Sequence, residues 1–310
     1  MLLINTKSTF PIKPALGVLI FCCLSLRLFG QYSDEILLYG LEYKNNGNEE
    51  KTFDGKGNLT HLSGYVTPRL LVYKPQNPCG TGIIICPGGG YARLNVENTR
   101  FIADRLTKMG ITVFVLIYRL PVNDSSARKS VAALQDVQAA FRIVRRRAKE
   151  WRLSDGKLGL WGSSAGGHLA AMAATHYSTS YVLGADTAGL RPDFLILAWP
   201  VISFRQDIAH NGSVKNLLGN NITEEQRTGY SSDEWVNIKT PPTFLVHASD
   251  DPTVQAANSI RFYEALKKAE VPAELHIYER GGHGFGLAPD VQDSWIGQLE
   301  LWLRRRNFIK

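Results

Sequence analysis

A serine flanked by glycines stands at the centre of the chain. Residues 162–166 read Gly-Ser-Ser-Ala-Gly, so Ser164 is the central serine of a G-x-S-x-G sequence between the apolar run 158–161 and an alanine-rich helix start. This pattern predicts a sharp strand-to-helix turn that exposes the Ser164 hydroxyl. The amide of Ala165 would point the same way, and the helix N-terminus adds partial positive charge where an oxyanion would form. The segment could supply a nucleophile and its electrophilic support; the alternative is a plain connecting turn.

A serine nucleophile needs two partners, and the later part of the chain offers them. A serine hydroxyl reacts poorly at neutral pH, so it needs a base, and the base needs a carboxylate that orients it. On a strand-turn-helix scaffold the expected order is Ser, then Asp or Glu, then His. The predicted strands 243–248 and 273–278 are followed by Asp250-Asp251 and by His283 in a glycine-rich loop. We expect His283 to be the base and Asp251 the acid, with Asp250 as the alternative. Packing or loop hydrogen bonding is the expected role of Ser163, His168 and His247.

A second glycine-rich turn follows a predicted buried strand. The apolar run 82–87 is typical of a strand covered on both faces, and three glycines follow it. The amides of Gly89 and Gly90 could face a reacting carbonyl oxygen, where a β-carbon would obstruct the approach. The alternative is a flexible connecting loop. Tyr91 and Trp199 are candidate substrate-binding residues in the pocket wall, and for both the alternative is a place in the core.

Strands and helices alternate along the chain. The pattern predicts strands at 64–74, 82–87, 111–117, 158–161, 194–199, 243–248 and 273–278, and helices at 99–109, 127–149, after Ser164, at 256–269 and at 292–306. This alternation predicts the α/β class, as a three-layer sandwich with a mostly parallel central sheet and helices on both faces. Ligands then bind at the carboxyl ends of the strands. Because the first of these strands contains Pro68, we expect it at the edge of the sheet.

The remaining segments fit a single domain over residues 31–310. Residues 31–62 are turn-rich and predict an irregular or β-rich opening, while 203–238 predict an inserted helical segment that crosses the strand ends and walls the pocket. Asp136, on the helix at 127–149, is expected to be a buried hydrogen-bonding group. Cys79 and Cys86 would lie about 23 Å apart in an extended chain, beyond disulfide reach. We therefore expect free thiols, with Cys86 buried.

The first thirty residues differ in composition from the rest. Two lysines precede the apolar run 15–29, and a small residue and a polar stretch follow it. This order predicts a secretory signal peptide over 1–30, hence a secreted or periplasmic protein without a stable membrane span. An uncleaved anchor helix is the alternative, although the run is short for a span of ~20 residues. Loss of Lys7, Lys13 and Arg27 with this segment would lower the formal net charge from +7 to +4. No large basic cluster with interleaved aromatic residues is present, which argues against nucleic acid as a partner.

Six segments together resemble the α/β-hydrolase fold, and more narrowly the bacterial acetylxylan-esterase-like carbohydrate esterases, over about residues 65–305. They are 86–91, 118–121, 162–168, 199–203, 247–252 and 281–286. The resemblance implies Ser164 as nucleophile, His283 as base and Asp251 as acid. It also implies an oxyanion hole made by the amides of Ala165, Gly89 and Gly90. Related esterases commonly open the glycine loop with a histidine; Pro87 stands there in this chain, which leaves open which loop amide is used.

The same resemblance implies a function. It is that of a secreted serine esterase that removes acetyl or other short acyl groups from plant polysaccharide such as xylan, through an acyl-enzyme and without metal or cofactor. The expected partner is an acetylated oligo- or polysaccharide. The alternatives are a general short-chain carboxylesterase, a serine peptidase on the same fold, and a non-catalytic glycan-binding protein. Residues 31–62 are too few for the extra domain that such peptidases usually carry, and the presence of all three triad members argues against a non-catalytic protein.

Overall fold

A computed structural model describes residues 32–40, 43, 47–121, 129–182, 185–285 and 289–310. The predicted signal peptide lies outside these residues. Within the described ranges, every helix is too short or too polar to cross a bilayer.

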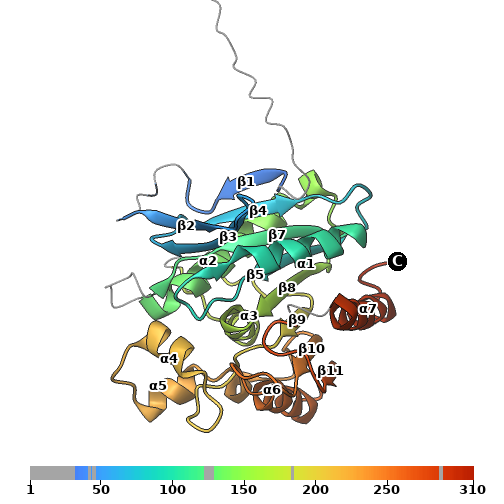
Figure 1. Ribbon diagram of the computed structural model, residues 1–310. Coiled ribbons are helices and arrows are strands. Elements are labelled where there is room, and N and C mark those ends of the chain that lie inside the picture. The colour runs from blue at the N-terminus through green and yellow to red at the C-terminus, as the bar shows by residue number, and fades with distance from the viewer. Residues whose placement is uncertain (1–31, 41–42, 44–46, 122–128, 183–184, 286–288) are drawn as a thin grey trace, which may run out of the picture. The chain divides into compact units, whose positions relative to one another are not determined.

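A mostly parallel sheet forms the centre of the fold (Figure 1). In the described residues it has eight strands in the order β1-β4-β7-β5-β8-β9-β10-β11. The pairs β1–β4 and β4–β7 are antiparallel, and the five remaining pairs are parallel. The parallel strands are continuous apolar runs from β7 to β10, as expected for strands covered on both faces. The bounds are β1 (Asp34–Leu37), β4 (Arg69–Tyr73), β5 (Gly82–Cys86), β7 (Thr112–Ile117), β8 (Leu158–Ser163), β9 (Leu195–Ala198), β10 (Thr243–Ala248) and β11 (Ala273–Tyr278).

The strand expected at the sheet edge is an inner strand, so that prediction is wrong. β4 is buried along its whole length and pairs with β7 on one side and β1 on the other. Pro68 lies just before β4, so its missing N–H costs the ladder no hydrogen bond. Its carbonyl oxygen instead accepts a 3.0 Å hydrogen bond from the amide of Leu38. The edge position belongs to β1, which comes from the opening segment.

The opening segment also forms a small second sheet that the sequence did not reveal. The antiparallel strands β2 (Glu49–Phe53), β3 (Leu59–Gly64) and β6 (Leu94–Asn95) make it up in that order. β3 packs against helix α1 (Val96–Lys108). The β-rich opening is thus confirmed, and β6 leads directly from the glycine loop into α1.

Helices cover both faces of the central sheet, as the neighbouring residues Trp161 and Gly162 of β8 show. Successive side chains of a strand point to opposite faces. The Trp161 ring lies 5.9 Å from the ring of Trp295 on helix α7 (Pro289–Arg305). A β-carbon on Gly162 would lie 2.7 Å from that of Ala170 on helix α3 (Ala165–Thr175). Helices α3 and α7 therefore flank opposite faces, which gives the predicted three layers. The other long helices are α2 (Lys129–Arg146) and α6 (Ala257–Lys268).

The segment 203–238 contains short helices. It contains α4 (Asn211–Leu218), α5 (Glu224–Gly229) and the short 3-10 helix η3 (Ser232–Trp235). Figure 1 shows α4 and α5 below α3. The Asn216 side chain donates a 2.8 Å hydrogen bond to the carbonyl oxygen of Gly90. The segment is thereby attached to the glycine loop.

Two single-residue expectations are also confirmed. Asp136 is fully buried and accepts hydrogen bonds from the Tyr39 hydroxyl at 2.6 Å and the Arg119 amide at 2.8 Å. Cys79 and Cys86 are free thiols, and Cys86 is buried.

Candidate active site

Ser164 sits on a strained turn between β8 and α3. Its φ of 55° and ψ of −125° lie in a region that residues other than glycine rarely adopt, at a typical cost of about 1–3 kcal/mol. The turn is held by close packing: a β-carbon on Gly166 would lie 2.1 Å from the carbonyl oxygen of Cys86. Glycine is therefore needed where α3 begins, so that the turn can approach the end of β5.

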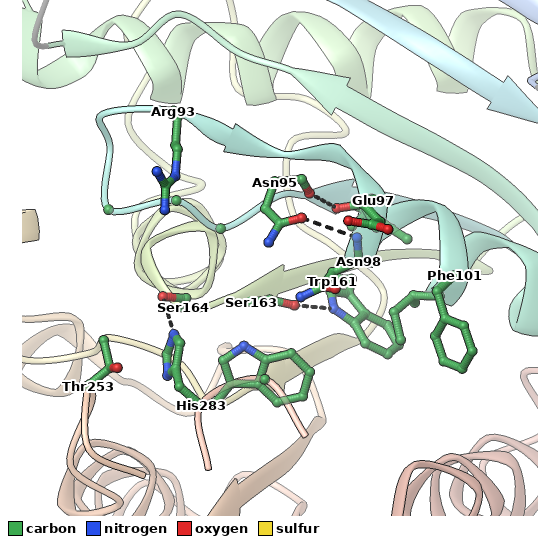
Figure 2. A pocket seen from close by; sticks show the side chains of 18 of the residues that line it. Arg93, Asn95, Glu97, Asn98, Phe101, Trp161, Ser163, Ser164, Thr253 and His283 are labelled. Atoms are coloured by element: carbon green, nitrogen blue, oxygen red, sulfur yellow. Dashed lines mark hydrogen bonds between the residues drawn. The ribbon is translucent and has the colours of Figure 1, made fainter. Parts of the chain in front are cut away.

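Three loops bring Ser164, His283 and Asp251 into one hydrogen-bonded series. Figure 2 shows the contact between Ser164 and His283. His283 Nε2 lies 2.9 Å from Ser164 Oγ, and His283 Nδ1 lies 2.7 Å from Asp251 Oδ2. The loops follow β8, β11 and β10, so all three side chains stand at the carboxyl end of the parallel sheet, where ligands bind in such folds.

Asp251 is held as a carboxylate, and this fixes the protons of the series. Burial by itself would raise its pKa, but hydrogen bonds from His247, His283 and the Val254 amide outweigh burial and hold the pKa of Asp251 well below its usual range. Its Oδ1 also accepts from the amide of Thr253 at 2.8 Å. A carboxylate can only accept, so Nδ1 of His283 carries the ring proton. Nε2 is then free to accept the proton of the Ser164 hydroxyl.

The neighbouring Asp250 has a different position. It is exposed, and its Oδ1 accepts a 2.8 Å hydrogen bond from the amide of Gly282. Asp250 thus ties the loop after β10 to the loop that carries His283, while Asp251 contacts the imidazole itself. Of the two aspartates, the structure brings Asp251 into the series.

His247 makes a contact that the sequence did not predict. It is fully buried and hydrogen-bonded, as expected, with Nδ1 2.8 Å from Ser259 Oγ and Nε2 2.9 Å from the carbonyl oxygen of Val254. The same Nε2 lies 3.3 Å from Asp251 Oδ2. Because the Val254 carbonyl can only accept, Nε2 carries the proton and also faces the carboxylate. The sequence feature that could have indicated this contact is the spacing of four residues between His247 and Asp251 at the end of a buried strand.

The glycine loop runs beside the nucleophile. A β-carbon on Gly88 would lie 3.0 Å from that of Ser164, and the Tyr118 hydroxyl anchors the loop through a 2.7 Å hydrogen bond to the Pro87 carbonyl. Both Gly89 and Gly90 have positive φ angles, of 133° and 65°. Within the described residues, the amides of Gly89, Gly90 and Ala165 donate no hydrogen bond. The glycine loop and the residue after Ser164 therefore offer three unpaired donors, and Gly89 and Gly90 line the same cavity as Ser164.

A cavity of about 810 Å³ opens at Ser164 and His283 (Figure 2). Its apolar lining includes Phe101, Ile102, Trp161, Trp199 and Trp295, and its polar lining includes Arg93, Asn95, Glu97, Asn98, Thr253 and His210. Of these residues, the sequence indicated Trp199 by name and His210 only as part of the segment 203–238. For the lining residues within 93–102, the available signal was their position directly after the glycine loop. Among the described side chains, no three His, Cys, Asp or Glu residues are grouped as ligands for a metal ion.

Tyr91 does not line this cavity, which corrects the expectation that it contacts substrate. Its ring is 1% exposed, and its hydroxyl lies 2.8 Å from His168 Nδ1. A buried phenol needs a hydrogen-bond partner, and His168 supplies it from helix α3, so the ring is drawn into the core between loop and helix. Trp199 borders the cavity as expected, while packing on Phe285 and Trp295.

His168 and Ser163 have the structural positions expected for them. The His168 ring stacks on Phe204 at 4.2 Å, and its Nε2 donates to the Tyr230 carbonyl at 2.7 Å. Burial lowers the pKa of His168 to about 4, so the ring is neutral near pH 7. Ser163 Oγ accepts a 3.0 Å hydrogen bond from the Trp161 indole, which holds Trp161 in the cavity wall.

The chain resembles known proteins over most of its length. The BD-FAE family model matches residues 70–266. An acetylxylan esterase of Xylanibacter ruminicola is 35% identical over 251 residues, which are 79% of this chain and 49% of that protein. Endo-1,4-beta-xylanase B of Butyrivibrio fibrisolvens is 32% identical over 72% of this chain and 36% of its own length. The chain thus spans half or less of these two curated relatives.

A solved structure covers nearly the whole length of the chain. The acetyl ester-xyloside bifunctional hydrolase from Caldicellulosiruptor lactoaceticus is 34% identical with a TM-score of 0.74, over 90% of this chain and 98% of that one. A carboxylesterase from Lactobacillus plantarum, at 20% identity and a TM-score of 0.66 over 86% of this chain and 99% of its own, shares the fold. The predicted fold is confirmed, and the chain belongs to the BD-FAE family of α/β-hydrolases.

Proposed function

We propose that this chain is a carboxylic ester hydrolase that uses Ser164 as its nucleophile to remove acetyl or other short acyl groups from acetylated polysaccharide such as xylan. The observation that carries the proposal is the series of hydrogen bonds of 2.9 and 2.7 Å from Ser164 through His283 to Asp251, beside the unpaired amides of the glycine loop. This arrangement supplies a nucleophile, a base and donors for an oxyanion at one point of the cavity.

The mechanism begins with acylation of the serine. Ser164 Oγ attacks the carbonyl carbon of the ester as His283 Nε2 takes the hydroxyl proton, and Asp251 stabilises the imidazolium that forms. The developing oxyanion accepts hydrogen bonds from the Ala165 amide and from an amide of Gly89 or Gly90, each worth about 3 kcal/mol. His283 then protonates the leaving sugar oxygen, and the C–O bond breaks to leave an acyl-serine.

Deacylation reverses these roles. Water enters the cavity, His283 removes one of its protons, and the resulting hydroxide attacks the acyl carbon. The second tetrahedral intermediate collapses, the proton returns from His283 to Ser164 Oγ, and acetate leaves. The lowered pKa of Asp251 keeps this residue ionised throughout.

Two observations support a sugar ester as the substrate. The chain resembles an acetylxylan esterase over most of its length, and it resembles a bifunctional acetyl ester-xyloside hydrolase in sequence and structure. The cavity also combines apolar rings such as Trp199 with exposed polar side chains such as Arg93 and Asn98. Rings and polar groups together suit a sugar, which has apolar C–H faces and hydroxyl edges. Secretion through residues 1–30 would bring the enzyme to such polymers.

Replacing Ser164 by Ala tests the nucleophile. The variant should remain folded, fail to hydrolyse p-nitrophenyl acetate, and escape the labelling by a fluorophosphonate that we expect at Ser164 in the wild type. Unchanged turnover, or wild-type protein that resists labelling, would remove the proposal.

Acetate release from acetylated xylan tests the substrate class. A carbohydrate esterase should hydrolyse acetylated xylan in preference to short acyl-nitrophenyl esters of the same acyl group. Equal preference would identify a general short-chain carboxylesterase instead.

A further inference from the structure

We propose that His210 determines the alcohol specificity of the site, by donating a hydrogen bond from Nε2 to a hydroxyl group of the sugar that carries the ester. This inference rests on the proposed esterase function and assigns a role to a residue of the inserted segment.

His210 lies at the junction between the inserted segment and the glycine loop. It is the N-cap of helix α4, and it lines the cavity together with Gly90. Its Cε1 is 4.0 Å from the point where a β-carbon on Gly90 would stand. Asn216 on the same helix bonds to the Gly90 carbonyl at 2.8 Å, so α4 is docked on this loop and the His210 ring is held at its rim.

The capping contact fixes which ring nitrogen carries the proton. The amide of Ser213 donates to His210 Nδ1 at 3.2 Å, and a backbone amide can only donate. Nδ1 must therefore be the acceptor, and a neutral ring then has its proton on Nε2. Burial lowers the pKa of His210, the nearby His283 lowers it further, and Asp251 opposes them, so the ring is neutral near pH 7.

The Nε2–H group is an unused donor. Within the described residues, His210 Nε2 has no hydrogen-bond partner. It is not one of the buried side-chain atoms that lack a partner, so this nitrogen is accessible to solvent. The half-buried ring therefore offers one open N–H, and the ring lines the cavity.

The proposed chemistry defines what this donor would meet. The ester carbonyl oxygen lies on the amides of the glycine loop, and the leaving oxygen lies on His283. The alcohol part of the ester must then occupy the space along the rim formed by His283 and Gly90, where His210 stands. In an acetylated sugar the carbon next to the esterified one commonly bears a hydroxyl, which accepts a hydrogen bond; a plain aliphatic or aryl alcohol has none to offer.

Two acetates that differ in one hydroxyl test this inference. They are cyclohexyl acetate and trans-2-hydroxycyclohexyl acetate. If the acetyl group of the second ester migrates to the neighbouring hydroxyl, the product is the same ester, so migration does not change the substrate. The wild type should prefer the hydroxylated ester by about tenfold in kcat/KM, the factor expected of one hydrogen bond of ordinary strength. In His210→Asn this preference should fall to near one. Asn is among the best N-cap residues, so the variant keeps the bond from Ser213 and loses only the Nε2 donor.

A second histidine provides the control. His61 is outside the cavity lining, so His61→Asn should keep the wild-type preference. A preference that persists in His210→Asn, an equal loss on both esters, or no preference in the wild type would each overturn the role of His210 while leaving the esterase intact. Failure of the wild type to hydrolyse either ester would instead refute the proposed function.

Discussion

Replacing Asp251 by Asn should abolish most of the ester hydrolysis without disturbing the backbone, because it reverses one hydrogen bond. The amides of Thr253 and Val254 donate to Asp251 Oδ1 at 2.8 and 2.9 Å. These donors cannot change direction, so the amide oxygen of the new side chain must take the place of Oδ1. Its NH₂ group then replaces Oδ2 and points at His283.

The consequence follows from the tautomer of His283. An NH₂ group can only donate, so Nδ1 must become the acceptor and the ring proton moves to Nε2. Nε2 then donates to Ser164 Oγ and no longer accepts from it. A base lost in this way typically costs about 10⁴ in kcat, or about 5 kcal/mol. His247 Nε2 carries a proton and lies 3.3 Å from Asp251 Oδ2. In the variant this N–H group would face the NH₂ group of the asparagine, so two donors would meet without an acceptor.

Turnover of p-nitrophenyl acetate by purified variants measures the effect, and Asp250 offers a matched control. An asparagine at 250 can still accept from the Gly282 amide through its side-chain oxygen, so Asp250→Asn should retain kcat/KM within a few-fold of the wild type. If Asp251→Asn kept a tenth or more of the activity, or if Asp250→Asn lost the larger share, the derived arrangement of donors and acceptors would be wrong.

Two further predictions concern stability. The free energy of unfolding, measured with denaturant, should be about 1 kcal/mol higher for Ser164→Gly than for Ser164→Ala. Glycine adopts the φ of 55° without strain, and this gain exceeds the cost of its larger unfolded-state entropy. An equal or lower value for Ser164→Gly would mean that the turn is unstrained. Burial lowers the pKa of His168 from 6.5 to about 4, so the unfolded chain binds this proton first as the pH falls. The contribution of neutral His168 to the free energy of unfolding is therefore complete above about pH 6.5, and it declines by about 3 kcal/mol as the pH falls toward 4. His168→Gln should show a shallower loss of stability over that pH range, and a slope equal to that of the wild type would exclude His168 as its source.

Local patterns in the sequence determined the elements of the fold. Continuous apolar runs became the buried strands β5, β7 and β10, because a parallel strand covered on both faces has no polar side to show. The G-x-S-x-G turn was readable for a related reason. A β-carbon on Gly162 would lie 2.2 Å from the carbonyl oxygen of Gly166, and one on Gly166 would lie 2.1 Å from that of Cys86, so only glycine fits at either position.

The edge strand and the small sheet were beyond such patterns. Pro68 would indicate an edge strand only if it lay among the hydrogen-bonded residues of the strand. β4 begins one residue later, at Arg69, so Pro68 lies outside it. Strand β6 has two residues and no periodicity to detect; it exists because β3 pairs with it. Pairing partners are chosen by tertiary packing, which a single segment does not record.

The sequence alone also named Ser164, His283 and Asp251, since a serine nucleophile requires a base and an acid in a known order. Only the tertiary structure decided that Asp251 reaches His283 across 32 positions of chain while Asp250 reaches Gly282, and that Tyr91 turns into the core. The physical reason is that the residue type fixes what a side chain can donate or accept, whereas its direction from a loop is set by neighbours that arrive from elsewhere in the chain.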